Sequence, residues 1–337
     1  MAFWNARTFI IAEAGVNHDG NPQTALRLID AAVEAGCDAV KFQTFDAAAL
    51  VVAQAPTASY QQRNGSGTDQ LAMLRKLELP RSCHQALQQH AASRGILFFS
   101  TAFDMSSIDF LQTLDIPLWK IPSGEITNYP YLACIAAMGK PVLLSTGMST
   151  LEEVQEAVAV LVEHGMRRDM LCVLHCNTQY PTPVSDVNLR AMVEMGTSLE
   201  LPYGYSDHTL GHDVAVAATA LGARVLEKHL TLDRQSPGPD HAASLHPDEL
   251  KSLVSAVRGI EQAMGDGIKR PSPSEVENKA IARKSIVAAR PIAAGEIFSA
   301  QNIATKRPGT GISPMRWNDV LGHAAKRDYA TDELIDP

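Results

Sequence analysis

Apolar runs and amphipathic segments alternate along the first 265 residues of the chain. The runs are rich in Val, Ile, Leu and Phe and predict eight buried strands. These strands are expected at 9–14, 39–45, 97–103, 118–122, 141–146, 171–176, 202–207 and 224–230. Eight strand–helix units in this length are typical of a (β/α)8 TIM barrel. A doubly wound open sheet is the alternative, but residues 15–20 lack its glycine-rich phosphate turn.

Segments with helical periodicity separate the strands. They lie at 23–35, 84–93, 106–114, 151–164, 213–221 and 247–264. Three helix starts carry side chains suited to capping: Asn21 before Pro22, the pair Ser106 and Ser107, and Thr150. The longest connection, 46–80, follows the second strand. Its polar and flexible centre, at 60–67, predicts a lid or substrate wall.

The pattern changes after Met264, so the TIM barrel is assigned to residues 1–265. Residues 266–282 are predicted to form a linker, rich at its start in Gly, Pro, Ser and basic residues and ending in a short helix. Residues 283–337 show short strands and turns and predict a small β-rich module. Such a module is marginal as an independent folder, so we expect it to pack on the barrel or on a partner chain.

Composition narrows the class of protein. A net charge of −8 argues against nucleic acid or an anionic membrane as the main partner. Five cysteines scattered through apolar runs indicate a reducing compartment. No apolar run approaches the roughly 18 residues of a membrane span, and no basic segment leads into a long apolar one at the start. We therefore expect a cytoplasmic protein.

Polar side chains stand at the carboxyl end of every predicted strand, where a TIM barrel has its active site. They are Glu13, Asn17, His18, Lys41, Gln43, Ser100, Thr101, Asp104, Lys120, Ser123, Glu125, Ser145, Thr146, His175, Asn177, Thr178, Tyr180, His208, Glu227 and His229. A purely structural barrel would not need such a ring, so an enzyme is indicated. Strand alternation gives some of these side chains structural roles inside the barrel.

His208 and His229 end the last two predicted strands. A helix joins these strands, so they lie parallel and both histidines leave the sheet at one edge. Asp240 follows on a Pro-Gly-Pro turn beside that edge. Either histidine alone is better explained as an ordinary strand-end residue, but the matched pair predicts a divalent metal site.

Lys41 and Lys120 interrupt apolar strands, where an unpaired ammonium is unfavourable by roughly several kcal/mol. An anionic ligand with a phosphate and a carboxylate would compensate them. Hydroxyl groups near the same mouth suit such a ligand: Thr101, Ser123 and Ser145. Structural pairing of the lysines with a carboxylate is equally open: Glu13, Glu125 or Glu227. A Schiff-base lysine, as in some barrel aldolases, is a third interpretation.

Nine motifs in order cover nearly the whole chain: residues 11–20, 41–44, 100–104, 120–125, 144–148, 180–183, 206–209, 227–229 and 306–311. They resemble the sialic acid synthase family, which condenses phosphoenolpyruvate with an N-acetylated amino sugar to make nine-carbon 2-keto sugar acids. The resemblance implies Mn²⁺, with Mg²⁺ or Co²⁺ as alternatives, bound by His208 and His229. It implies a metal-activated aldehyde and cleavage of the C–O bond of phosphoenolpyruvate.

The resemblance also assigns roles to single residues. Phosphoenolpyruvate is implied to bind at Lys41, Thr101, Lys120, Ser123 and Ser145, and at Asn177 or Thr178, between which the motif does not choose. The open-chain sugar is implied to contact Glu13, Gln43, Asn64, Tyr180 and Asp240. The implied catalytic residues are Glu125, Asp240, Glu13 and Lys120, and both Glu125 and Asp240 are candidates for handling the protons of water.

The C-terminal module resembles the antifreeze-like (SAF) domain of the family. The resemblance implies a domain-swapped homodimer in which Arg307 binds the N-acetyl group of the sugar in the partner's site. The expected product is of the N-acetylneuraminate type, and N,N'-diacetyllegionaminate from 2,4-diacetamido-2,4,6-trideoxymannose is the alternative. Residues expected to distinguish the two sugars are Gln62, Asn64 and Ser66. Two other classes stay open: a pyruvate-type aldolase, metal-dependent or using Lys120, and an inert barrel whose module binds ice or glycans.

Overall fold

Two compact units divide the chain, residues 1–265 and residues 266–337. The computed structural model describes residues 3–4, 6–52, 54–58, 61–62 and 69–336. In the first unit, eight parallel strands join in the order β3-β2-β1-β8-β7-β6-β5-β4, and β3 also lies against β4. The strands are β1 Phe9–Gly15, β2 Ala39–Thr44, β3 Leu97–Ala102, β4 Trp119–Ile121, β5 Val142–Ser145, β6 Leu171–Cys176, β7 Tyr203–Asp207 and β8 Val225–His229. The predicted TIM barrel is confirmed.

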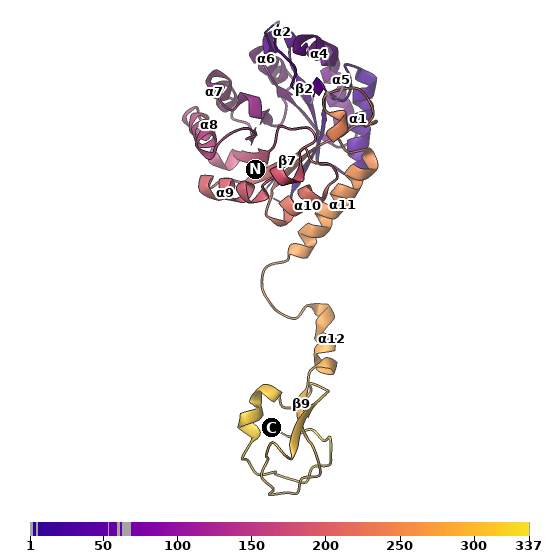
Figure 1. The fold of residues 1–337 in the computed structure, drawn as a ribbon, viewed down its shortest axis with the longest axis vertical. Helices are drawn as coiled ribbons and strands as arrows, with labels where there is room; N and C mark the ends of the chain where they lie inside the picture. Colours follow the sequence, from indigo (N-terminus) through magenta and orange to yellow (C-terminus); the bar gives the residue numbers. More distant parts are fainter. Residues whose placement is uncertain (1–2, 5, 53, 59–60, 63–68, 337) are drawn as a thin grey trace. The chain divides into compact units, whose positions relative to one another are not determined.

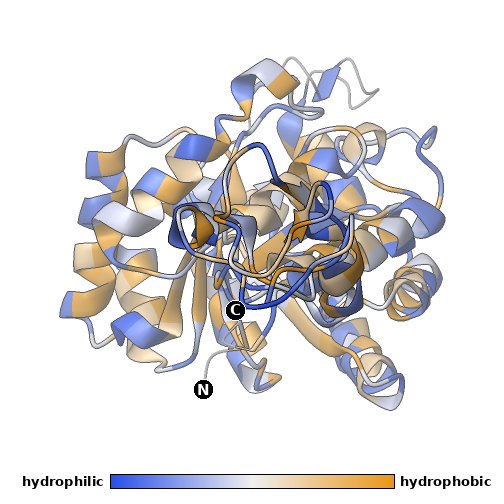
Figure 2. Ribbon diagram, turned by 90° about the horizontal axis from the view of Figure 1, so that it is seen from below, coloured by the Kyte–Doolittle hydropathy of each residue, from blue (hydrophilic) through white to orange (hydrophobic). Residues whose placement is uncertain are grey.

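One helix follows each strand and packs outside the sheet, as Figure 1 shows. These helices are α1 Pro22–Ala35, α5 Arg81–Ser93, α6 Met105–Thr113, α7 Tyr129–Ala137, α8 Leu151–Glu163, α9 Leu189–Leu199, α10 Asp213–Ala220 and α11 Pro247–Met264. The long connection after β2 holds two short helices, α2 Ala47–Leu50 and α4 Gln70–Leu77. Hydrophilic and hydrophobic residues alternate along the outer helices, whereas the strands are mostly hydrophobic (Figure 2).

Capping explains where several helices begin. Asn21 caps α1 ahead of Pro22, and Thr150 forms a reciprocal capping box with Glu153 at the start of α8. The prediction that a serine caps α6 is wrong. The cap is Asp104, because its carboxylate accepts hydrogen bonds from the backbone N–H of Ser107 and from the hydroxyls of the two serines that follow it.

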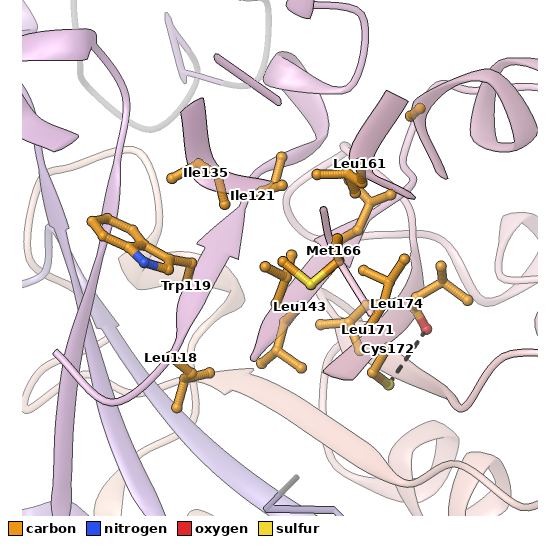
Figure 3. Close-up of a cluster of buried hydrophobic side chains, with 14 of the residues drawn as sticks. Leu118, Trp119, Ile121, Ile135, Leu143, Leu161, Met166, Leu171, Cys172 and Leu174 are labelled. Carbon is orange, nitrogen blue, oxygen red and sulfur yellow. Dashed lines mark hydrogen bonds between the residues drawn. The ribbon is translucent and has the colours of Figure 1, made fainter. Parts of the chain in front are cut away.

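The barrel core between β4, β5, β6 and the helices α7 and α8 is formed by side chains almost without exposure (Figure 3). They include Ile121, Ile135, Leu143, Leu161 and Leu171. Truncating a side chain in such a cluster to alanine typically lowers stability by about 2–5 kcal/mol. The core therefore holds the strands rigidly while their carboxyl ends remain available for polar groups.

Charged side chains at the amino ends of the strands fasten α11 to the sheet. Arg258 donates through Nη1 to the carbonyl oxygen of Thr8 at 2.7 Å and through Nη2 to Asp38 Oδ2 at 2.7 Å. Glu261 accepts from the backbone N–H of Thr8 at 2.5 Å. This cluster lies at the end of the barrel away from the polar strand ends, so it serves stability.

Replacing Arg258 by alanine is expected to lower the free energy of unfolding of the barrel by about 2 kcal/mol, because hydrogen bonds to charged groups are lost in a half-buried setting. Urea unfolding would measure this. Arg270→Ala is the matched control, since Arg270 pairs with Asp266 in an exposed position and should change the value by less than about 0.5 kcal/mol. Equal effects of the two variants would show that the cluster adds no stability.

The second unit contains α12 Pro273–Ala282, strands β9 Ser285–Ala288 and β10 Ile303–Lys306, and the short helix α13 Trp317–Val320. The two strands pair antiparallel, and buried residues around them form a separate small core. The short helix expected before the module is present. Residues 294–297 and 308–311 lie in turns and bends, with one isolated bridge at Ile297.

Among the described residues, no helix combines the length and the apolar composition needed to cross a membrane.

Candidate active site

A cavity of about 480 Å³ lies at the carboxyl ends of the barrel strands. Its size suits small-molecule ligands. Eleven predicted site residues line it: Glu13, Lys41, Gln43, Thr101, Lys120, Ser123, Ser145, Thr178, Tyr180, His208 and His229. The barrel therefore gathers, around one space, groups that come from all eight strands or from the loops that directly follow them.

Two buried lysines and two buried glutamates are linked by ion pairs in this cavity. Lys41 Nζ lies 2.9 Å from Glu13 Oε2 and 3.7 Å from Glu227 Oε1. Lys120 Nζ donates to Glu227 Oε1 at 3.0 Å. The structural pairing left open by the sequence thus exists for Glu13 and Glu227, whereas Glu125 takes no part in it. Ion pairing does not exclude an anionic ligand, because the lysines also face the cavity.

Burial and the ion pairs shift the pKa values of these four groups in different directions. Burial raises the pKa of Glu13 to about 7, despite the opposing effect of Lys41. Burial acts upward on the pKa of Glu227 too, but the two lysines hold it well below its usual range. Burial lowers the pKa of Lys120, and the carboxylates raise that of Lys41. The raised pKa of Glu13 weakens the negative charge of the cavity and so favours an anionic ligand.

Hydroxyl groups add hydrogen-bonding capacity on the side of β3, β4 and β5. Ser145 Oγ is buried and has no hydrogen-bond partner among the described residues. Thr101 Oγ1 accepts from Lys41 Nζ at 3.0 Å, and Ser123 Oγ accepts from the backbone N–H of Gly147 at 2.9 Å. A buried polar group without a partner is unfavourable, so Ser145 indicates a place where a polar ligand atom or water binds.

His208 and His229 end adjacent strands, and their ring centroids are 5.4 Å apart. His208 donates through Nδ1 to the carbonyl oxygen of Asn177 at 2.5 Å and stacks on Tyr180, which leaves Nε2 available. His229 Nδ1 is buried without a hydrogen bond among the described residues and lies 3.8 Å from Asp240 Oδ2. The predicted convergence of the two histidines is therefore present in the structure.

Both imidazoles are neutral at physiological pH. Burial lowers the pKa of His208 to about 4. Burial and then the neighbouring His208 hold the pKa of His229 well below its usual range. Neutral imidazole is the form that binds a metal ion, so the pair fits such a role. In the part of the chain that the structure describes, no group of three His, Cys, Asp or Glu side chains forms a complete metal cage. Water and ligand oxygens would have to supply the remaining positions.

The structure bears on two choices that the sequence left open, Asn177 or Thr178 and Glu125 or Asp240. Thr178 lines the cavity, whereas the side chain of Asn177 accepts a hydrogen bond from the backbone N–H of Gln179 at 2.7 Å. Neither Glu125 nor Asp240 is among the residues that line the cavity, and Glu125 accepts from Asn128 Nδ2 at 2.6 Å. Asp240 is buried beside His229, and burial raises its pKa to about 6.

Four further predicted residues are not among the described residues that line the cavity. Asn64 and Ser66 lie outside the described residues. Arg307 belongs to the second unit, and its role stays a prediction. Gln62 donates to the carbonyl oxygen of Thr57 at 3.1 Å and does not line the cavity, whereas Gln61 does.

Sequence reasoning missed Ser206 and left Glu227 out of the ligand-binding and catalytic residues. Ser206 lines the cavity and donates to Glu227 Oε1 at 3.1 Å. Glu227 was expected only as one of three possible partners of the lysines, and it pairs with both of them. The signal was strand alternation, because each residue lies two positions before a cavity-facing histidine and therefore points the same way.

The chain is similar to proteins of one family along nearly its whole length. The NeuB family matches residues 28–269, and the SAF domain matches residues 283–337. The N,N'-diacetyllegionaminic acid synthases of Campylobacter jejuni and Legionella pneumophila are 50% and 46% identical to the chain. These alignments cover 98% and 93% of this chain and 99% and 89% of the relatives. The crystal structure of an N-acetylneuraminic acid synthetase from Leptospira borgpetersenii, in complex with citrate, superposes with a TM-score of 0.71 at 33% identity over 81% of this chain and 90% of that one.

Proposed function

Because the chain belongs to the NeuB family of sialic acid synthases, we propose that it makes N,N'-diacetyllegionaminate from phosphoenolpyruvate, water and 2,4-diacetamido-2,4,6-trideoxymannose. The family establishes the class of reaction, the condensation of phosphoenolpyruvate with an N-acetylated amino sugar. The choice of sugar is carried by the 50% identity to a diacetyllegionaminic acid synthase over 98% of the chain. This favours the alternative product of the sequence analysis over N-acetylneuraminate.

Phosphoenolpyruvate is proposed to bind where cations and hydroxyls meet in the cavity. The lysines face two carboxylates, so a ligand with a phosphate and a carboxylate can share the cationic charge with them. The hydroxyl of Ser145 supplies a donor that none of the described protein groups uses. The proposed contacts are Lys41, Thr101, Lys120, Ser123, Ser145, Thr178 and Ser206.

The sugar is proposed to lie on the side of the cavity formed by the histidines. Glu13, Gln43 and Tyr180 line this region, and Gln43 Nε2 donates to Glu13 Oε1 at 3.0 Å. His208 and His229 would hold a divalent ion, Mn²⁺ in preference to Mg²⁺ or Co²⁺, through neutral nitrogens. When bound there, the ion would act as a Lewis acid toward the aldehyde of the open-chain sugar. The protein itself orients the aldehyde and the enol side by side.

The atoms of the reaction balance without any further reactant. Carbon 3 of phosphoenolpyruvate forms a bond to the aldehyde carbon, and the oxygen of water forms a bond to carbon 2. The bond between carbon 2 and the bridging oxygen then breaks, and phosphate leaves. One proton of water ends on the former aldehyde oxygen, and the other leaves on phosphate. We assign these proton transfers to Asp240 rather than Glu125, because burial raises the pKa of Asp240 to about 6 and Glu125 is engaged by Asn128.

The choice of sugar can be tested by phosphate release from phosphoenolpyruvate with each sugar in turn. We expect a kcat/KM for 2,4-diacetamido-2,4,6-trideoxymannose at least about tenfold above that for N-acetylmannosamine, since a missing acetamido group leaves polar groups of the site unpaired. Mass spectrometry of the product confirms its identity. A preference for N-acetylmannosamine would identify the product as N-acetylneuraminate. Turnover with neither sugar would contradict both assignments.

Gly147 leaves no room for a side chain beside the proposed phosphate contacts. A Cβ atom there would lie 2.8 Å from Thr178 Cγ2 and 2.9 Å from Ser123 Oγ. Gly147→Ala is therefore expected to raise the KM for phosphoenolpyruvate by about tenfold or more, because it displaces hydroxyls that hold the ligand. Gly259→Ala, where a Cβ meets nothing within 4 Å, is the control and should leave the KM unchanged. An unchanged KM in Gly147→Ala would show that these hydroxyls do not bind phosphoenolpyruvate.

Exposed apolar side chains lie in, or directly after, five of the connections that follow the barrel strands. They are Val52, Met105, Met148, Val184 and Leu210, of which Met148 lines the cavity. Exposed apolar side chains that gather on one face are typical of a surface that another protein covers. The second unit also exposes Ile297 and Met315. We assign the cover to the SAF domain of a second copy, so that Arg307 enters the partner's site in a domain-swapped homodimer.

Complementation between two inactive variants tests this exchange. Coexpressed Arg307→Ala and Lys120→Met chains form a mixed dimer, in which one site combines an intact barrel with an intact Arg307. We expect activity to reappear in the mixed dimer, at up to about half the wild-type value per dimer, although each variant alone is inactive. Mixed dimers without activity would place Arg307 in the site of its own chain or outside any site.

A further inference from the structure

Asp207 and Lys228 form an ion pair with no exposure at all, next to the two cavity histidines. Lys228 Nζ donates to Asp207 Oδ2 at 2.8 Å and to the carbonyl oxygen of Thr209 at 2.6 Å. Asp207 Oδ1 accepts from the backbone N–H of Thr209 at 2.9 Å and from its hydroxyl at 2.7 Å. Neither charged group lines the cavity, so the pair does not contact a ligand there.

The Asp207–Lys228 pair lies at the end of the hydrogen-bond ladder between β7 and β8. The ladder between β7 and β8 pairs Tyr205 with Leu226 and ends at Asp207 and Lys228. His208 and His229 are the next residue on each strand, one step beyond the last ladder pair. At this point, the regular hydrogen bonds of the sheet no longer fix the backbone of one strand to that of the other.

The contacts of Lys228 replace the ladder beyond its last pair. Lys228 holds Asp207 on one side of His208 and the carbonyl oxygen of Thr209 on the other. It is also the residue that precedes His229. One ammonium group therefore ties the Asp207 carboxylate and the Thr209 backbone, on either side of the first histidine, to the strand that carries the second. Alternation along the strands turns the ion pair away from the cavity and both histidines toward it.

We infer that the Asp207–Lys228 ion pair positions His208 and His229 so that both can bind one metal ion. This inference rests on the proposed metal site. Stability does not explain the pair, because replacing a buried ion pair by neutral groups of similar volume is often neutral or stabilising. Groups that orient metal ligands from behind typically change metal affinity by about 10–100-fold when they are removed.

The test is direct Mn²⁺ binding by the metal-free full-length protein, measured by calorimetry, together with its melting temperature in EDTA. The double variant Asp207→Asn/Lys228→Met removes both charges at once and leaves no unpaired charge in the core. We expect the dissociation constant for Mn²⁺ to rise by about tenfold or more while the melting temperature does not fall. An unchanged dissociation constant would overturn the inference.

Thr209 offers a milder pair of variants if the double variant fails to fold. Thr209→Val removes the hydroxyl that donates to Asp207 Oδ1, and Thr209→Ser retains it. We expect Mn²⁺ to bind several-fold more weakly to the valine variant than to the serine variant, which should match wild type. Equal binding by the two would overturn the inference. Absence of Mn²⁺ binding by wild type would overturn both the inference and the metal site on which it rests.

Discussion

Replacing His229 by alanine is expected to lower kcat by about three orders of magnitude, since Lewis-acid activation contributes on the order of several kcal/mol. The substitution removes one of the two nitrogens proposed to hold the ion, and the described residues contain no group of three His, Cys, Asp or Glu side chains that could hold it instead. Phosphate release measured over a range of Mn²⁺ concentrations, before and after EDTA treatment, would show both the loss of rate and the loss of metal dependence.

His90→Ala is the matched control for His229→Ala. His90 lies on the outer helix α5, where its Nε2 pairs with Asp30 at 2.9 Å, so its loss should change kcat by less than about twofold. An His229→Ala variant that keeps EDTA-sensitive activity within tenfold of wild type would contradict the assignment of this histidine to the metal.

Lys120→Met is expected to lower kcat/KM for phosphoenolpyruvate by at least about two orders of magnitude. The reason is electrostatic. Lys120 is the nearer of the two cations that neutralise Glu227, at 3.0 Å against 3.7 Å for Lys41. Without it, an anionic substrate would meet a buried carboxylate that is only partly compensated. Steady-state kinetics with phosphoenolpyruvate as the varied substrate would measure the effect.

Two further variants separate binding from stability. Lys140→Met is the matched control, because Lys140 pairs with the exposed Asp115 and should leave kcat/KM unchanged. Lys120→Met should also lower the free energy of unfolding by about 3 kcal/mol, and adding Glu227→Gln should restore most of that loss but not the activity. Full activity in Lys120→Met would contradict the proposed binding of phosphoenolpyruvate.

The aldolase alternative predicts a different result at the same lysine. A Schiff-base enzyme would trap pyruvate on Lys120 when borohydride is added, and the adduct would be visible by mass spectrometry. We expect no adduct, because the proposed reaction passes through no imine. A pyruvate adduct on Lys120 would establish the aldolase instead.

Most of the barrel could be predicted from the sequence because parallel strands buried on both faces read as short continuous apolar runs. Of the eight outer helices, α7 and α9 were not among those expected. Residues of α7 are nearly all apolar, so its amphipathic period is weak, and α9 ends in Gly196 and residues of low helix propensity. The cap of α6 was misplaced because Asp104 reaches over two serines that are themselves common caps.

Which residues line the site could be predicted from the sequence, but which of them form ion pairs with one another could not. Strand ends converge in any TIM barrel, which places the lysines, hydroxyls and histidines around one space. Which glutamate neutralises Lys120 depends on a contact across 107 positions of sequence, and three glutamates were equally suitable. The outward-facing Asp207–Lys228 pair gave no signal of its own, because a charged residue in a strand has no visible partner until the neighbouring strand is in register.

The most direct test of the proposed reaction uses phosphoenolpyruvate labelled with ¹⁸O at the bridging oxygen, together with Mn²⁺ and 2,4-diacetamido-2,4,6-trideoxymannose. Condensation with C–O cleavage predicts that the released phosphate carries the label and that its release requires the sugar. Unlabelled phosphate would mean that the bond to phosphorus is cut, and release at the same rate without sugar would mean that phosphoenolpyruvate is hydrolysed alone. Either result would contradict the synthase reaction.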